Sequence, residues 1–112
     1  SGNGLVKLGS VDGEIINSVA VSASDPSKDV QGLISMVNNT ENWVQNGETA
    51  EDEEEFVWGV VFILESKKLQ ARYRVHISEG DWTDWFSEGE VAADWESQYY
   101  IDAIELAAEA RK

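Results

Sequence analysis

The strongest constraint on this chain is an internal similarity at a fixed offset. Residues 43–50 align with residues 85–92, and Trp, Gly, Glu and Ala coincide at a constant offset of 42 residues. The same offset brings Phe62 onto Ile104 farther along the chain. Repeats of this length are supersecondary units that bury their apolar faces only against neighbouring units. The similarity therefore predicts one small domain assembled from repeated units.

Further alignment sets the expected bounds of these units. Val30 and Gln31 align with Leu69 and Gln70 at an offset of 39 residues, so the later unit gains three residues before its tryptophan. A weaker similarity at the start of the chain, without tryptophan, predicts a partial third unit. We expect a single domain over residues 1–112 with sub-repeats at about 4–24, 30–66 and 69–108.

Two segments have the composition and pattern of β-strands. Residues 56–64 are rich in β-branched and aromatic side chains, which strands favour. From Leu69 to Ile77 the apolar residues occupy alternate positions and so lie on one face of a strand. Residues 65–68 between them are suited to a hairpin turn. Together with the similarity at 42 residues, these strands predict an all-β, internally repeated domain.

Local helical signals favour a different fold class. Asp25 and Pro26 make a good helix start, and the apolar residues that follow lie at helical spacing up to Val37. The tail from Trp95 onwards has helical spacing too. The alternative is therefore an α+β domain in the order strand-strand-helix-strand-strand-helix, with helices near 25–38 and 95–110.

The chain is strongly acidic. Lys and Arg total 8 against 22 Asp and Glu, which gives a formal net charge of −14. Such a field repels phosphates, so we expect no nucleic-acid partner. The longest apolar run is too short to span a bilayer, so we expect no membrane insertion. An exposed acidic loop, able to meet a basic protein partner, is expected at Glu51, Asp52, Glu53, Glu54 and Glu55.

Residues suited to catalysis are scarce. The chain has no cysteine, and His76 is its only histidine, so a tetrahedral zinc site is not expected. His76 lies on the strand face opposite Tyr73, where we expect a hydrogen-bonded structural residue. No nucleophile or phosphate-binding motif is present, and we predict neither an enzyme nor a cofactor. One turn region is crowded with carboxylates that lack calcium-loop spacing and are interpreted as solvated: Asp81, Asp84, Glu88 and Glu90.

A pattern of aromatic, histidine and glycine residues runs through the second half of the chain. It consists of Tyr73, His76, Trp82-Thr83-Asp84-Trp85, Gly89-Glu90, Ala92 and the closing residues 101–106. In these residues the chain resembles the ChW family, the clostridial hydrophobic repeats with a conserved tryptophan. Asp81 and Glu96 depart from it, because the family has Gly there, and residues 30–64 match more loosely. The resemblance implies a secreted or cell-surface bacterial protein that binds polysaccharide or a cell-surface protein.

The tryptophans are the best candidates for contact with a ligand. Trp43 and Trp85 occupy matching places in two units, which indicates core positions. Trp82 has no counterpart, so we expect its ring to be exposed and to stack on a sugar, whose hydroxyl groups would donate to nearby carboxylates. The predicted ligand-binding residues are Tyr73, Trp82, Asp84 and Glu90.

These observations support two functions of different classes. The first is a non-catalytic binding module, extracellular or at the cell surface, that recognises carbohydrate or another surface ligand. The second is an acidic interaction or inhibitor protein, of the nucleic-acid-mimic or immunity type, that occupies a basic groove on a partner. In the second case we expect a cytoplasmic protein and affinity that falls steeply with salt.

Overall fold

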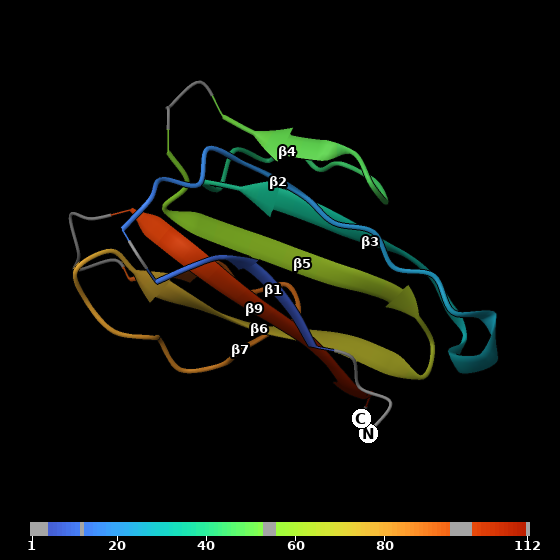
Figure 1. Ribbon diagram of the computed structural model, residues 1–112. Coiled ribbons are helices and arrows are strands. Elements are labelled where there is room, and N and C mark those ends of the chain that lie inside the picture. The colour runs from blue at the N-terminus through green and yellow to red at the C-terminus, as the bar shows by residue number, and fades with distance from the viewer. Residues whose placement is uncertain (1–4, 12, 53–55, 95–99, 112) are drawn as a thin grey trace.

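The protein is built from β-strands. The computed structural model describes residues 5–11, 13–52, 56–94 and 100–111. Over these residues the chain forms nine strands and a short 3-10 turn, η1, with no α-helix, which confirms the all-β prediction (Figure 1). The elements are β1 (Leu5–Gly9), β2 (Ser18–Ala20), η1 (Pro26–Lys28), β3 (Val30–Val37), β4 (Thr49–Glu51), β5 (Gly59–Ser66), β6 (Leu69–Ile77), β7 (Phe86–Ser87), β8 (Ala92–Ala93) and β9 (Ile101–Ala110).

The strands form three antiparallel sheets. One sheet has the order β1-β9-β6-β7, the second has the order β3-β5-β8, and β2 pairs with β4 in the third. Strands β5 and β9, each paired on both edges, cross the middle of the molecule (Figure 1). The described residues include no helix long and apolar enough to cross a membrane.

The α+β alternative is wrong where the structure describes it. Asp25 does cap a helical turn, because its carboxylate accepts the N–H of Ser27 at 3.1 Å, but the turn is η1 and ends at Lys28. The chain then enters β3, which pairs with β5 along most of its length. Residues 101–110 form β9, paired on both edges, whereas 95–99 lie outside the described residues. Pairing across the sheets overrides the local helical spacing.

The strand predicted over 56–64 starts later than expected, at Gly59. The reason is the buried side chain of Asn38, whose amide nitrogen donates to the carbonyl of Phe56 at 2.9 Å. Its Oδ1 accepts the N–H of Trp58 at 2.8 Å. Asn38 thus satisfies the carbonyl of Phe56 and the N–H of Trp58, while the backbone of Val57 bonds to Ile16 and Ile101. Regular pairing with β3 begins beyond these residues.

The predicted strand over Leu69–Ile77 is confirmed as β6, and its apolar face lies inward as the alternation indicates. The hairpin prediction at 65–68 is wrong, because β5 and β6 lie in different sheets. The short connection between them is held by Arg111, whose guanidinium donates to the carbonyls of Leu64, Ser66 and Leu69 at 2.9 to 3.2 Å. A close turn here joins two sheets at one end of the core.

The core fills the space between the sheets. Its largest fully buried side chains include Tyr73 and Phe62, whose rings meet edge to face with centroids 5.2 Å apart. Both β5 and β6 contribute to it, so it depends on the two sheets being held together. Its other large members are Leu33, Val37, Val57, Val60, Val75, Ile101 and Ile104.

Two turns that lie 42 residues apart, at the offset found in the sequence, have the same geometry. Gly47 and Gly89 both have a positive φ, of 82° and 87°, at the same place in a four-residue turn. In each turn the side chain before the glycine accepts two backbone N–H groups from different segments of the chain. Asn46 accepts from Ala23 at 2.7 Å and Leu33 at 3.2 Å.

Glu88 makes the corresponding contacts in the later turn. Its Oε1 accepts the N–H of Leu64 at 2.7 Å and of Ala71 at 3.1 Å. Strand β4 follows the first turn and β8 follows the second, and each pairs with a strand of the preceding sub-repeat, β2 and β5 respectively. Matching side chains thus hold matching strands, which supports the predicted repeat; the repeat itself stays a prediction.

Candidate ligand-binding face

The outer face of the sheet that contains β1, β9 and β6 carries a row of polar side chains. Because neighbours along a strand point to opposite sides, burial of Tyr73 and Val75 places Arg72, Arg74 and His76 on the outer face of β6. All three are half-buried instead of fully solvated. Something on the outside of the sheet therefore covers them.

Two tryptophans supply that cover. The guanidinium carbon of Arg74 lies 4.6 Å from the ring centroid of Trp82 and 4.9 Å from that of Trp85. Arg72 lies 5.5 Å from the same Trp85 ring. These distances are within the range of cation–π attraction. We call Arg72, Arg74, Trp82 and Trp85 the Trp–Arg array.

Carboxylates of β9 fix the two arginines of the array. Arg74 forms an ion pair with Glu105, whose side chain is almost fully buried and also lies 3.5 Å from the ammonium of Lys7. Arg72 pairs with Glu109 at 3.3 Å. The array and its two carboxylate partners thus hold charges of both signs in fixed positions beside two indole rings.

His76 extends the array toward the buried interior. Its Nδ1 lies 2.7 Å from Oδ1 of Asp102, and the other carboxylate oxygen accepts the N–H of Gly13 at 3.0 Å. The ring of Trp82 meets the imidazole edge to face, with centroids 5.3 Å apart. His76 is hydrogen-bonded, as expected, and its carboxylate partner ties β9 to the loop after β1.

Two hollows flank the Trp–Arg array. A hollow of about 380 Å³ lies beside Trp82 and is lined by Arg74, Lys7 and Glu105 among others. A smaller one of about 170 Å³ lies beside Trp85, with Arg72 and Glu109 in its wall. Each hollow therefore combines an indole ring with a guanidinium and a carboxylate.

Tyr73 was predicted to bind ligand, and that prediction is wrong. Its side chain is 0% exposed, because position 73 falls on the inward face of β6. Its hydroxyl donates to the carbonyl of Glu90. Burial raises the pKa of the Tyr73 phenol to about 12, with further contributions from the charges of Glu90 and Glu88.

This raised pKa predicts a loss of stability in alkali that depends on Tyr73. The folded state favours the neutral phenol, so its contribution is complete below the ordinary tyrosine pKa near 10 and is lost as pH rises toward 12. We expect about 2 kcal/mol of the free energy of unfolding to be lost over this range. Tyr73→Phe should remove that part of the pH dependence. Urea unfolding at several pH values measures it, and parallel curves for the two proteins would contradict the assignment.

The other predicted ligand-binding residues have different surroundings. Trp82 is half-buried within the array, and Asp84 beside it is exposed. The carboxylate of Glu90 accepts the N–H of Ser87 at 2.9 Å, so it stabilises the turn before β8. Trp82 and Asp84 remain predicted ligand contacts. Glu90 has a structural role, because its carboxylate binds the N–H of Ser87 and its carbonyl accepts the Tyr73 hydroxyl.

Trp43 and Trp85 were predicted to be core residues, and both are exposed, by 43% and 36%. The reason is alternation along the chain. In each unit the next residue, Val44 or Phe86, pairs with a strand and packs against the core, so the tryptophan before it points outward. The two tryptophans therefore do occupy matching positions, but these positions lie at the surface.

The acidic residues of the turn region do not form a metal site. Glu88 is engaged with two backbone N–H groups and, through Oε2, with Arg111 at 2.9 Å. Across the parts of the chain that the structure describes, no group of three or more potential ligands is placed to hold a metal ion.

The acidic run is described only at its start. Glu51 is exposed at the end of β4, and Asp52 accepts a hydrogen bond from the side-chain amide of Asn38 at 3.1 Å. Both line an open polar hollow of about 700 Å³ together with Thr40 and Asn42. Glu53, Glu54 and Glu55 lie outside the described residues, so the proposed contact with a basic partner stays a prediction.

Comparison with known proteins adds no relative. No family model, no curated protein and no solved structure matches this chain. The resemblance to ChW repeats therefore stays a prediction.

Proposed function

We propose that the chain is a non-catalytic binding module and that the Trp–Arg array holds its ligand, a carbohydrate. The supporting observation is the exposure of Trp85 beside two arginines whose positions are fixed by Glu105 and Glu109. Indole rings stack on the apolar faces of sugars, while guanidinium and carboxylate groups bond to sugar hydroxyls. A ring, donors and acceptors on one rigid sheet supply all three kinds of contact.

Rigidity favours this use of the face. Each arginine is held by an ion pair and by an indole ring, so little side-chain freedom remains to be lost when a ligand binds. The hollow beside Trp82, of about 380 Å³, lies within the range of about 300–1,000 Å³ that is usual for small-ligand pockets. The resemblance to ChW repeats supports a polysaccharide or a cell-surface protein as partner, in an extracellular or cell-surface setting.

The direct test is a glycan array followed by titration of the best hit with single-tryptophan variants. We expect Trp85→Ala to weaken binding at least tenfold, because truncating an aromatic anchor typically costs about 2 kcal/mol or more. Trp43→Ala is the matched control and should bind normally, since Trp43 is also exposed but lies outside the array. Equal effects of the two substitutions, or no glycan bound, would count against the proposal.

The acidic-inhibitor alternative is separated by its salt dependence. Affinity through the run that begins at Glu51 should collapse between 50 and 500 mM salt, whereas stacking on Trp85 should change little, because only exposed charges are strongly screened. A partner whose binding is lost with salt and kept in Trp85→Ala would favour the alternative.

A further inference from the structure

β2, β5 and β9 occupy corresponding places in the three predicted sub-repeats. Among the described residues, β5 and β9 have a partner on both edges and β2 has a partner on one. β2, β5 and β9 each have a short strand along one edge, namely β4, β8 and β1. On the other edge, β5 pairs with β3 and β9 pairs with β6, strands of eight and nine residues. Among the described strands, none pairs with the second edge of β2.

The correspondence can be followed bond by bond. The carbonyl of Val21, just after β2, accepts the N–H of Gly47 at 3.0 Å, as the carbonyl of Phe62 in β5 accepts that of Gly89 at 3.4 Å. The N–H of Ala23 and the N–H of Leu64 donate to the matching side chains Asn46 and Glu88, both at 2.7 Å. Residues 21–24 therefore continue from β2 as residues 62–65 of β5 continue beyond its pairing with β8. In both segments one edge is bonded to the turn with the positive-φ glycine.

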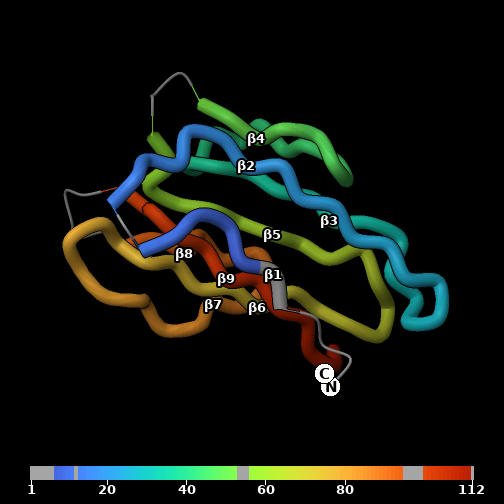
Figure 2. The backbone as a smooth tube through the Cα atoms, in the orientation of Figure 1, coloured from blue at the N-terminus to red at the C-terminus, as the bar shows by residue number. Residues whose placement is uncertain are grey.

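No described strand occupies the opposite edge of this segment. In an extended chain, successive backbone groups point to alternate sides, so those of Ala20, Ser22 and Ser24 face away from β4. All three residues are exposed, and the backbone of Ser22 and Ser24 makes no hydrogen bond to any described residue. Figure 2 shows the segment running from β2 along one side of the molecule to η1. An edge of this kind is a template for adding a strand.

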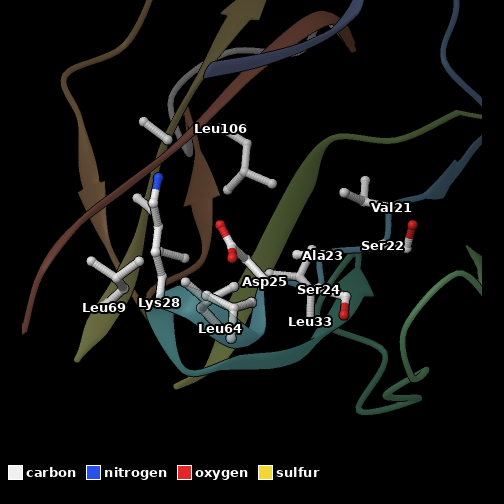
Figure 3. A pocket seen from close by; sticks show the side chains of 14 residues that line it. Val21, Ser22, Ala23, Ser24, Asp25, Lys28, Leu33, Leu64, Leu69 and Leu106 are labelled. Carbon is white, nitrogen blue, oxygen red and sulfur yellow. The ribbon is translucent and has the colours of Figure 1, made fainter. Parts of the chain in front are cut away.

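An apolar hollow of about 620 Å³ adjoins the free edge. Residues 21–25 form one wall, and side chains from η1, β3, β5, β6 and β9 form the rest, as Figure 3 shows. The principal apolar side chains around it are Val21, Ala23, Leu33, Leu64, Leu69 and Leu106. A strand added to the edge would place every second side chain in this hollow.

We propose that the free edge of residues 18–24 binds an extended peptide from another polypeptide, antiparallel to β2. β6, which occupies the corresponding edge of β9, indicates the peptide that fits. β6 turns Ala71, Tyr73 and Val75 inward and carries Arg72 and Arg74 between them. The expected partner has apolar side chains at alternate positions, and basic side chains between them suit a chain with a net charge of −14. The proposal is independent of the carbohydrate face.

Hydrogen exchange with a synthetic peptide of the β6 sequence, residues 69–77, tests this edge directly. We expect the amides of Ala20, Ser22 and Ser24 to exchange on the order of tenfold more slowly when the peptide is bound, because pairing closes their N–H groups to water. The same peptide with its central tyrosine replaced by proline should not protect them. Unchanged exchange at all three amides with saturating peptide would overturn the proposal.

Variants of the edge complete the test. Ser22→Pro removes an outward N–H without breaking an internal bond, so the protein should keep its circular dichroism spectrum and lose peptide binding by tenfold or more. Ser22→Thr is the matched control and should bind normally. Trp85→Ala should bind the peptide normally too, which separates this site from the carbohydrate face. Protection of the three amides by dimerisation of the chain alone would overturn the assignment to a separate peptide.

Discussion

Replacing Phe62 with alanine should lower the free energy of unfolding by about 3–5 kcal/mol, as is typical for truncation of a buried phenylalanine. Phe62 is 0% exposed and lies at the centre of β5, with its ring edge to face on Tyr73 of β6. Its loss removes the aromatic contact that joins two sheets and leaves a cavity between them. Urea unfolding followed by far-ultraviolet circular dichroism measures the effect.

A matched control comes from Phe56, which is 37% exposed. Phe56→Ala should cost less than about 1 kcal/mol, because little apolar area is returned to water at a surface position. Similar losses for the two variants would mean that the core does not lie between β5 and β6.

The second large effect is expected at Glu88. Its carboxylate accepts the N–H groups of Leu64 and Ala71 and pairs with Arg111, whose guanidinium holds the carbonyls of the β5–β6 turn. Glu88→Ala leaves two backbone donors and a guanidinium without their acceptor, so we expect a loss of about 2–4 kcal/mol in the free energy of unfolding. Hydrogen exchange of the Leu64 and Ala71 amides should quicken in parallel.

Glu88→Gln separates hydrogen bonding from charge. In the corresponding turn, the neutral amide of Asn46 accepts two backbone N–H groups at 2.7 and 3.2 Å. A glutamine oxygen should do the same at position 88, so this variant should lose less than half of what Glu88→Ala loses. Equal losses would assign the effect to the ion pair with Arg111 instead.

The fold could be predicted where apolar and polar side chains alternate along a strand, because the alternation separates its buried face from its exposed face. Alternation over Leu69–Ile77 gave β6 with its correct bounds and inward face. The helical spacing after Asp25 was misleading, because it arises in a strand whose residues are mostly buried, so apolar positions no longer alternate. Pairing of β3 with β5, a partner distant in sequence, decides the structure there.

The candidate site was only partly predictable. Trp82 was expected to be exposed, and it is half-buried against Arg74 and His76. Tyr73 was chosen from its place in a motif, although its own alternation places it inward. The same alternation places Arg72 and Arg74 on the outer face of β6, so both could have been chosen as candidate site residues. Their partner Trp85 was missed because a matched position in two units was interpreted as a core position. The arginines of the Trp–Arg array lie in β6 and its tryptophans lie in the connection from β6 to β7. Their contact depends on how this connection folds over the sheet, and residue spacing does not show that.

The most direct test of the proposed binding face is an NMR titration that follows the indole N–H signals of the tryptophans with a glycan bound by the protein. We predict that the signals of Trp82 and Trp85 shift together and saturate, while those of Trp43 and Trp58 stay in place. Shifts confined to Trp43, or none at the two rings beside Arg74, would show that the ligand binds elsewhere and would contradict the assignment of this face.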